Sequence, residues 1–74
     1  MIYPSIEALV SIWQDSNGRV QAKVIMDDGE RLSLYEGSTF SDDNIESFTI
    51  NEKLSFLERT VAFWQPVTPS IFLD

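Results

Sequence analysis

Carboxylates are the most plentiful reactive groups in this chain, and two short runs bring several of them together. One run reads Asp27-Asp28-Gly29-Glu30 and the other reads Asp42-Asp43-Asn44. Grouped carboxylates can hold a cation or transfer protons. The first run is similar to part of a calcium loop, but the spacing of acidic residues and the distal Glu of such a loop are missing. Both runs have the composition of solvated turns, so we expect neither a metal site nor a cofactor.

The other side chains that commonly carry chemistry are absent or lack a partner. The sequence contains no Cys and no His, which removes thiolates, disulfides and the commonest general base and metal ligand. Ser and Thr are plentiful, but no His is present to activate a hydroxyl as a nucleophile. No Gly-rich phosphate loop is present either. The sequence therefore predicts a protein that is not an enzyme.

Negative charge is concentrated in the middle of the chain. The whole formal net charge of −7 arises in residues 27–52, where eight acidic residues stand against Arg31 alone. Direct binding of nucleic acid is disfavoured, because such binding depends on Lys and Arg. Two interpretations stay open for the acidic segment: solvated turns that keep the protein soluble, or a recognition face for a basic partner.

Length and composition indicate one small domain. The 74 residues are 43% hydrophobic, which is enough for a single core. No apolar run approaches the ~20 residues of a membrane span, and the first residues lack the pattern of a signal peptide. We expect a lead-in over residues 1–7 (a linker or a short helix), a β domain over 8–65 and a Pro-containing tail over 66–74.

Alternation of apolar and polar residues predicts a β-meander in the first half of the domain. Residues 9–13 are rich in branched and aromatic side chains, and Asn17-Gly18 favours a type I′ hairpin turn. Residues 19–26 have a period of two, with one face apolar and the other mostly polar. Asp27-Asp28-Gly29 turns the chain, and alternation resumes over 31–35. This hairpin is expected to end at Tyr35-Glu36-Gly37. A capped amphipathic helix from Ser5 to Trp13 is an alternative to the first strand.

Three further strands are expected over 45–50, 54–57 and 61–64. The predicted fold is therefore all-β: a small antiparallel β-sandwich or barrel of about six short strands, arranged as two three-stranded sheets. Aromatic residues exceed the needs of such a core, so some are expected to form an interface. Exposed strand edges offer a second binding route. The candidate partner-binding residues are Lys23, Ile25, Tyr35, Phe40, Asp42, Asp43, Glu46, Arg59 and Trp64.

The order of these segments resembles a known family. L-V-S-I-W, G-R-V-Q-A-K-V-I-M, D-D-G-E-R-L-S-L-Y-E-G, N-I-E-S-F-T-I and K-L-S-F-L follow one another over residues 8–64. This series resembles the C-terminal periplasmic domain of PilP-type proteins of type IV pilus systems, especially those of conjugative thin pili. It is also similar to the homology-region domain of GspC in type II secretion. The corner of those families usually reads Gly-Asp, whereas Ser38 follows Gly37 here.

The resemblance implies a non-enzymatic adaptor. Such a domain would be a β-sandwich that docks on a secretin or on inner-membrane pilus proteins, periplasmic and tied to the membrane only through an upstream segment. The alternative is a small cytoplasmic acidic inhibitor of the kind that a phage could encode. It would mimic the charge of nucleic acid and block a DNA- or RNA-binding protein. A small barrel that binds nucleic acid or another ligand is a third, less favoured reading.

Overall fold

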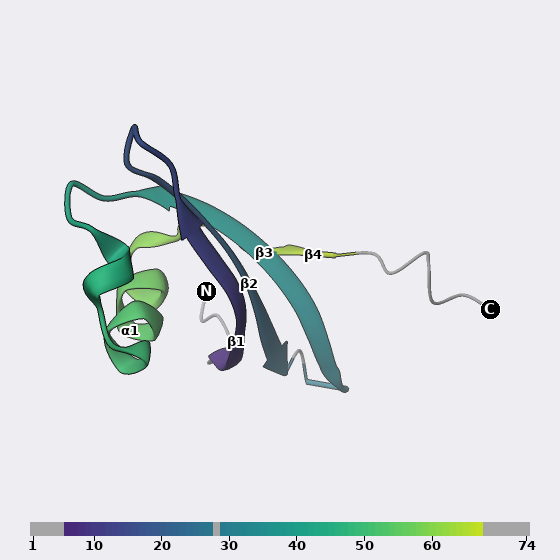
Figure 1. Ribbon diagram of the computed structural model, residues 1–74. Helices are drawn as coiled ribbons and strands as arrows, with labels where there is room; N and C mark the ends of the chain where they lie inside the picture. The colour runs from purple at the N-terminus through teal and green to yellow at the C-terminus, as the bar shows by residue number, and fades with distance from the viewer. Residues whose placement is uncertain (1–5, 28, 68–74) are drawn as a thin grey trace.

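The protein is a single curved antiparallel sheet with one helix packed on it. The computed structural model describes residues 6–27 and 29–67. The sheet has the order β1-β2-β3-β4, and α1 lies on one side of it (Figure 1). The strands are β1 (Ile6–Gln14), β2 (Arg19–Asp27), β3 (Leu32–Phe40) and β4 (Gln65–Pro66). The helical elements are the 3₁₀ turn η1 (Ile45–Ser47) and α1 (Ile50–Thr60).

The predicted meander is confirmed, and its strands are longer than expected. The chain is already in β1 at Ile6, so the alternative helix up to Trp13 is wrong over the described residues. β3 does not turn a corner at Gly37 but continues to Phe40, with Gly37 opposite Ala22 of β2. Gly37 is needed for space rather than for a turn. An added Cβ would lie 2.7 Å from Cγ1 of Val61 and 2.8 Å from Cε3 of Trp64.

The two-sheet sandwich of six strands is wrong, because two of the expected strands in the second half of the chain are helical and the sheet is single. The expected strands at 45–50 and 54–57 are η1 and α1, and residues 61–64 form an irregular segment that leads into β4. A capping box starts α1. Thr49 Oγ1 accepts from the Glu52 amide at 3.1 Å, and Glu52 Oε1 accepts from the Thr49 amide at 2.8 Å. These two bonds satisfy N–H groups that a helix start leaves without partners.

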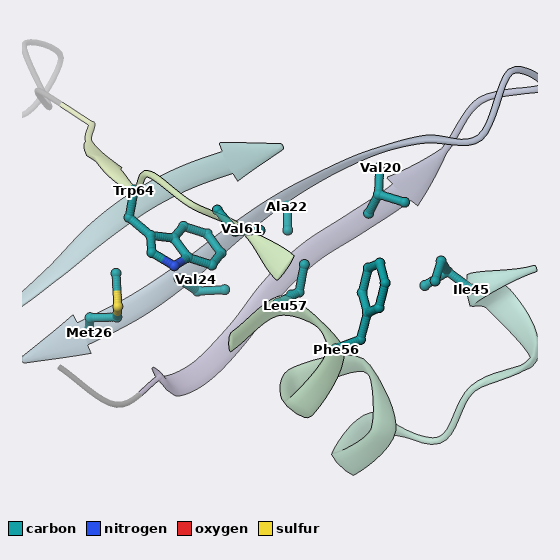
Figure 2. Packing of buried hydrophobic residues seen from close by; sticks show 9 residues of the cluster. All are labelled: Val20, Ala22, Val24, Met26, Ile45, Phe56, Leu57, Val61 and Trp64. Atoms are coloured by element: carbon teal, nitrogen blue, oxygen red, sulfur yellow. The ribbon is translucent and has the colours of Figure 1, made fainter. Parts of the chain in front are cut away.

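The core lies between the sheet and α1 and is built mainly on β2. The burial of β2 alternates strictly, so every second side chain points at the helix. Figure 2 shows Trp64 near Met26 at one end of the core, Leu57 near the middle, and Phe56 toward Val20 and Ile45 at the other end. The buried side chains are Val20, Ala22, Val24, Met26, Ile45, Phe56, Leu57, Val61 and Trp64.

The first hairpin turn differs from the expected type I′ geometry. Gly18 has a φ of +88°, but Asn17 does not have a positive φ. Asp15 organises the turn instead: its Oδ1 accepts from the amides of Asn17 at 2.8 Å and of Arg19 at 3.0 Å. An Asp side chain that accepts hydrogen bonds from backbone amides two or more residues later in the chain can stabilise a turn in which Asn does not adopt the left-handed conformation.

β1 is an irregular edge strand. Its pairing with β2 shifts between Ile6 and Ala8 and again between Leu9 and Ser11. Glu7 and Val10 are thus extra residues that the register skips, which is the mark of β-bulges. The expected lead-in and tail fall mostly outside the described residues, although Ile6 and Pro66 already belong to the sheet.

Candidate functional site on the uncovered face of the sheet

The side of the sheet away from α1, called the open face below, is not covered by any described element. Residues directly opposite each other on antiparallel strands point to the same side. Because Val20, Ala22, Val24 and Met26 point at α1, the residues between them and their register partners belong to the open face. On the three long strands these are Ala8, Ser11, Trp13, Arg19, Gln21, Lys23, Ile25, Asp27, Leu32, Leu34, Glu36, Ser38 and Phe40.

The open face is apolar and aromatic near its ends and polar in the middle. Ile25 lies opposite Leu34 toward one end, and Lys23 lies opposite Glu36 in the middle. Toward the other end Phe40 lies opposite Arg19 and is 67% exposed. Exposed aromatics of this size contribute strongly to binding when a partner covers them.

A groove of about 700 Å³ crosses this face. Trp13 of β1 stands on one side and is 51% exposed, and Phe63, which follows α1 and is 64% exposed, stands on the other. Gln21, Lys23 and Glu36 are among its lining residues. The combination of aromatic walls with hydrogen-bonding groups between them suits a polypeptide, which carries apolar side chains and a polar backbone.

An acidic hollow of about 360 Å³ lies at the end of the sheet where β1 meets β2 and β3 ends. It is lined by the β1–β2 turn and by residues 41–44, and its acidic groups are Asp15, Asp42 and Asp43. In the described part of the chain, no hydrogen bond engages the carboxylates of Asp42 or Asp43. These two charges are therefore directed to solvent.

Gln14 fixes the loop that carries these charges. Its Nε2 donates to the carbonyl of Asp43 at 2.9 Å and to that of Ser41 at 3.2 Å, and its Oε1 accepts from the Ile45 amide at 3.0 Å. The Ser41 amide also donates to the Gly18 carbonyl at 2.9 Å. Because β1 and the β1–β2 turn both hold the loop, its backbone keeps a set position relative to the sheet.

The structure brings some of the predicted binding residues together and separates others. Lys23, Ile25 and Phe40 share the open face, with Asp42 and Asp43 at its end. Glu46 is exposed in η1. The remaining candidates lie elsewhere: Tyr35 packs against the core, Trp64 is buried within it, and Arg59 is on the last turn of α1.

Sequence reasoning noted a surplus of aromatics but did not separate the exposed ones from the buried ones. Trp13 and Phe63 are exposed, while Trp64 is 6% exposed and fills the core. Trp13 pairs with Gln21 across β1 and β2, and Gln21 belongs to the open face. The alternation of β2 together with this pairing therefore places Trp13 on the open face. The role of Gln14 has no signal in the sequence, because its partners lie 27 to 31 residues away.

The described residues contain neither a cluster suited to a metal ion nor a helix suited to a membrane. Among them, no group of three or more His, Cys, Asp or Glu residues is placed to hold a metal ion. No helix in this part of the chain is long and apolar enough to cross a membrane. No protein-family model matches the sequence, and neither a curated protein nor a solved structure does.

Proposed function

We propose that this protein is a non-enzymatic protein-interaction domain that binds its partner through the open face. One observation carries the proposal. The helix covers one side of the sheet, while the other side presents Trp13 and Phe40, each more than half exposed. Exposed aromatic residues with hydrogen-bonding groups beside them are typical of a protein–protein interface.

The distribution of exposed apolar residues supports the face as the binding surface. Of the six large hydrophobic residues that are exposed in the described chain, four lie on the open face or beside its groove: Trp13, Leu32, Phe40 and Phe63. The strand edges are less suitable for pairing. β1 is interrupted by two register shifts, and β4 already occupies part of the β3 edge.

The assignment to a type IV pilus or secretion assembly is the more specific form of the proposal. It supposes docking on a secretin or on inner-membrane pilus proteins. The spacing of the sequence segments supports it, although the family's sandwich is not the fold of this chain. The acidic inhibitor is the second candidate, and the exposed carboxylates of Asp42 and Asp43 favour it.

Binding of a ¹⁵N-labelled sample to the N-terminal region of a secretin, and separately to a basic DNA-binding protein, tests these candidates. We expect amide shifts in β1, β2 and β3, with a dissociation constant below about 100 μM for the true partner. Trp13→Ser and Phe40→Ser should each weaken binding about tenfold or more. Ile50→Ser is the matched control, because Ile50 is 57% exposed but lies on α1.

Two results would contradict the proposal. Amide shifts confined to α1 would show that the partner binds the helix and not the open face. Equal losses for Trp13→Ser and Ile50→Ser would show that the aromatics of the open face are not the contact. Binding to the DNA-binding protein but not to the secretin would favour the inhibitor over the adaptor.

A further inference from the structure

We infer that the open face binds the open face of a second copy of this chain, around a twofold axis that runs along the strands between β2 and β3. This inference rests on the proposed function, because it takes the open face as the binding surface, and it adds an occupant for that face. A sheet with one uncovered face can bury it against a second sheet, as in a β-sandwich. The order of side chains across the sheet supports a copy of the same sheet as that partner.

Two rows of residues across the sheet have the same character when they are read from either edge. A row means the residues that lie directly opposite one another on neighbouring strands and so share the open face. The first row is polar at both edges, with a cation beside an anion in the middle, and consists of Ser11, Lys23, Glu36 and Gln65. The second row is apolar throughout and consists of Ala8, Ile25, Leu34 and Val67, whose amide donates to the Leu34 carbonyl at 2.8 Å. Reversing either row therefore exchanges residues of like character, apart from the cation and the anion.

A third row crosses the groove and has an aromatic residue near each edge. Trp13 lies opposite Gln21, and Gln21 lies opposite Ser38. Phe63 lines the same groove from the segment that follows α1. Across the sheet, this row is aromatic, polar, polar and aromatic, so it also keeps its character when it is reversed.

A twofold axis along the strands makes use of this arrangement. Such an axis places β2 over β3 of the second copy and β1 over β4, while each row stays over the same row. Lys23 then faces the second copy's Glu36, and Trp13 faces the second copy's Phe63. Every contact of this kind occurs twice, as in any isologous interface. An axis at right angles to the strands through the charged row would instead place Lys23 over Lys23, so charge favours the axis along the strands.

The charge of the open face also suits contact between copies. The chain has a net charge of −7, so two copies repel each other where acidic surfaces meet. On the three long strands, the basic residues of the open face are Arg19 and Lys23, and they are balanced by the acidic residues Asp27 and Glu36. The net negative charge therefore lies outside this face, and contact through it brings together the electrically neutral parts of two chains.

The area of the face indicates a weak and reversible dimer. Three strands of nine residues span roughly 30 by 14 Å, at about 3.3 Å per residue along a strand and about 4.8 Å between strands. This area of roughly 400 Å² is smaller than the ~800 Å² that each partner of a stable complex buries. The row of Asp27 and Leu32, at the end of the strands, does not keep its character when it is reversed and adds nothing to the contact. We therefore expect a dissociation constant of about 10–200 μM.

Sedimentation velocity from about 5 μM to about 1 mM protein measures this association. Lys23→Glu and Glu36→Lys should each weaken the dimer about tenfold or more, because each change places like charges against each other twice. A mixture of the two variants should restore the dimer, since both facing pairs are then of opposite charge. The pair within one chain cannot explain such a rescue, because each variant keeps two like charges side by side.

Net charge alone predicts a different result. Glu36→Lys makes the net charge of −7 less negative, which on its own would strengthen association. Arg59→Glu is the matched control for Lys23→Glu, because it makes the same change of charge at an exposed position on α1. It should leave the dissociation constant within about twofold of the value for the unmodified chain. Circular dichroism checks that all variants are folded.

The inference and the proposed function fail in different ways. A chain that stays monomeric at about 1 mM, or a dimer that the mixed variants do not restore, overturns the second copy as the occupant and leaves the open face as the proposed binding surface. A dimer whose amide shifts on dilution map to α1 overturns the second copy as well. If neither the secretin nor the DNA-binding protein binds while the mixed variants restore the dimer, the proposed partners are wrong and the second copy stands.

Discussion

Gly37 and Trp64 are packed so closely that no side chain fits between them. A Cβ on Gly37 would lie 2.8 Å from Cε3 of the indole ring, which is far inside normal van der Waals contact. The pair joins the middle of β3 to the segment after α1, two parts of the chain that are 27 positions apart. This contact lets a single helix and one tryptophan close the core over a four-stranded sheet.

Replacing Gly37 by Ala should therefore displace Trp64. We expect a loss of about 1–3 kcal/mol in the free energy of unfolding, since overpacking a core has this cost. Urea denaturation measures the loss, and near-UV circular dichroism reports on the indole. Gly29→Ala is the control: Gly29 has a φ of +99°, but an added Cβ meets no atom within 4 Å. Gly29→Ala should lower the stability through backbone strain but leave the near-UV signal of Trp64 unchanged. Equal near-UV spectra for the two variants would contradict the close packing of Gly37 against Trp64.

Replacing Gln14 by Ala should release the acidic loop. The change removes the acceptor of the Ile45 amide and the donor to two carbonyls. These bonds are part-buried or exposed, so we expect a loss of about 0.5–1.5 kcal/mol in the free energy of unfolding. Hydrogen exchange should accelerate at Ile45 and leave β2 protected. Gln65→Ala, in the exposed strand β4, should change neither the free energy of unfolding nor the hydrogen exchange at Ile45. Unaltered exchange at Ile45 in the Gln14 variant would refute the role assigned to the Gln14 side chain.

Thr49→Ala should destabilise α1 from its first turn. Loss of a helix N-cap costs about 0.5–2 kcal/mol. The bond in which Glu52 Oε1 accepts from the Thr49 amide should weaken as well, because the two bonds of the capping box support each other. Thermal unfolding followed at 222 nm measures the effect. Ser55→Ala, at an exposed position inside α1, should be neutral or slightly stabilising. If the two variants melted at the same temperature, the capping box would have no energetic weight.

The two tryptophans should differ sharply in their access to a soluble quencher. Trp13 is 51% exposed on the open face, and Trp64 is 6% exposed in the core. Fluorescence of Trp64→Phe should be quenched efficiently by acrylamide and emit at long wavelength. Fluorescence of Trp13→Phe should be resistant and shifted to the blue. The opposite ranking would show that the sheet presents its other face to solvent.

The first half of the fold could be predicted because its information is local. Alternation in β2 marks both its faces, and glycine and aspartate mark its turns. The second half could not be predicted in this way from short apolar runs alone. Residues 54–57 fit a strand and a helix equally well, and Thr49 with Glu52 three positions later was the signal for the helix.

The candidate site was predictable only in part for the same reason. Lys23, Ile25 and Phe40 follow from the register of the meander. The burial of Trp64 depends on space left by Gly37, and that relation appears only when the chain is folded. A glycine that provides room and a glycine that provides a turn look identical in a sequence.

The alternation of β2 determines which of its positions can be substituted without loss of the fold. Its inward residues Val20, Ala22, Val24 and Met26 supply close to half of the buried core, whereas their neighbours along the strand take no part in it. Mutations at the outward positions can therefore accumulate without loss of the fold. One strand thus separates the residues that keep the molecule folded from those that the proposed partner would contact, so descendants of this protein could exchange one such partner for another.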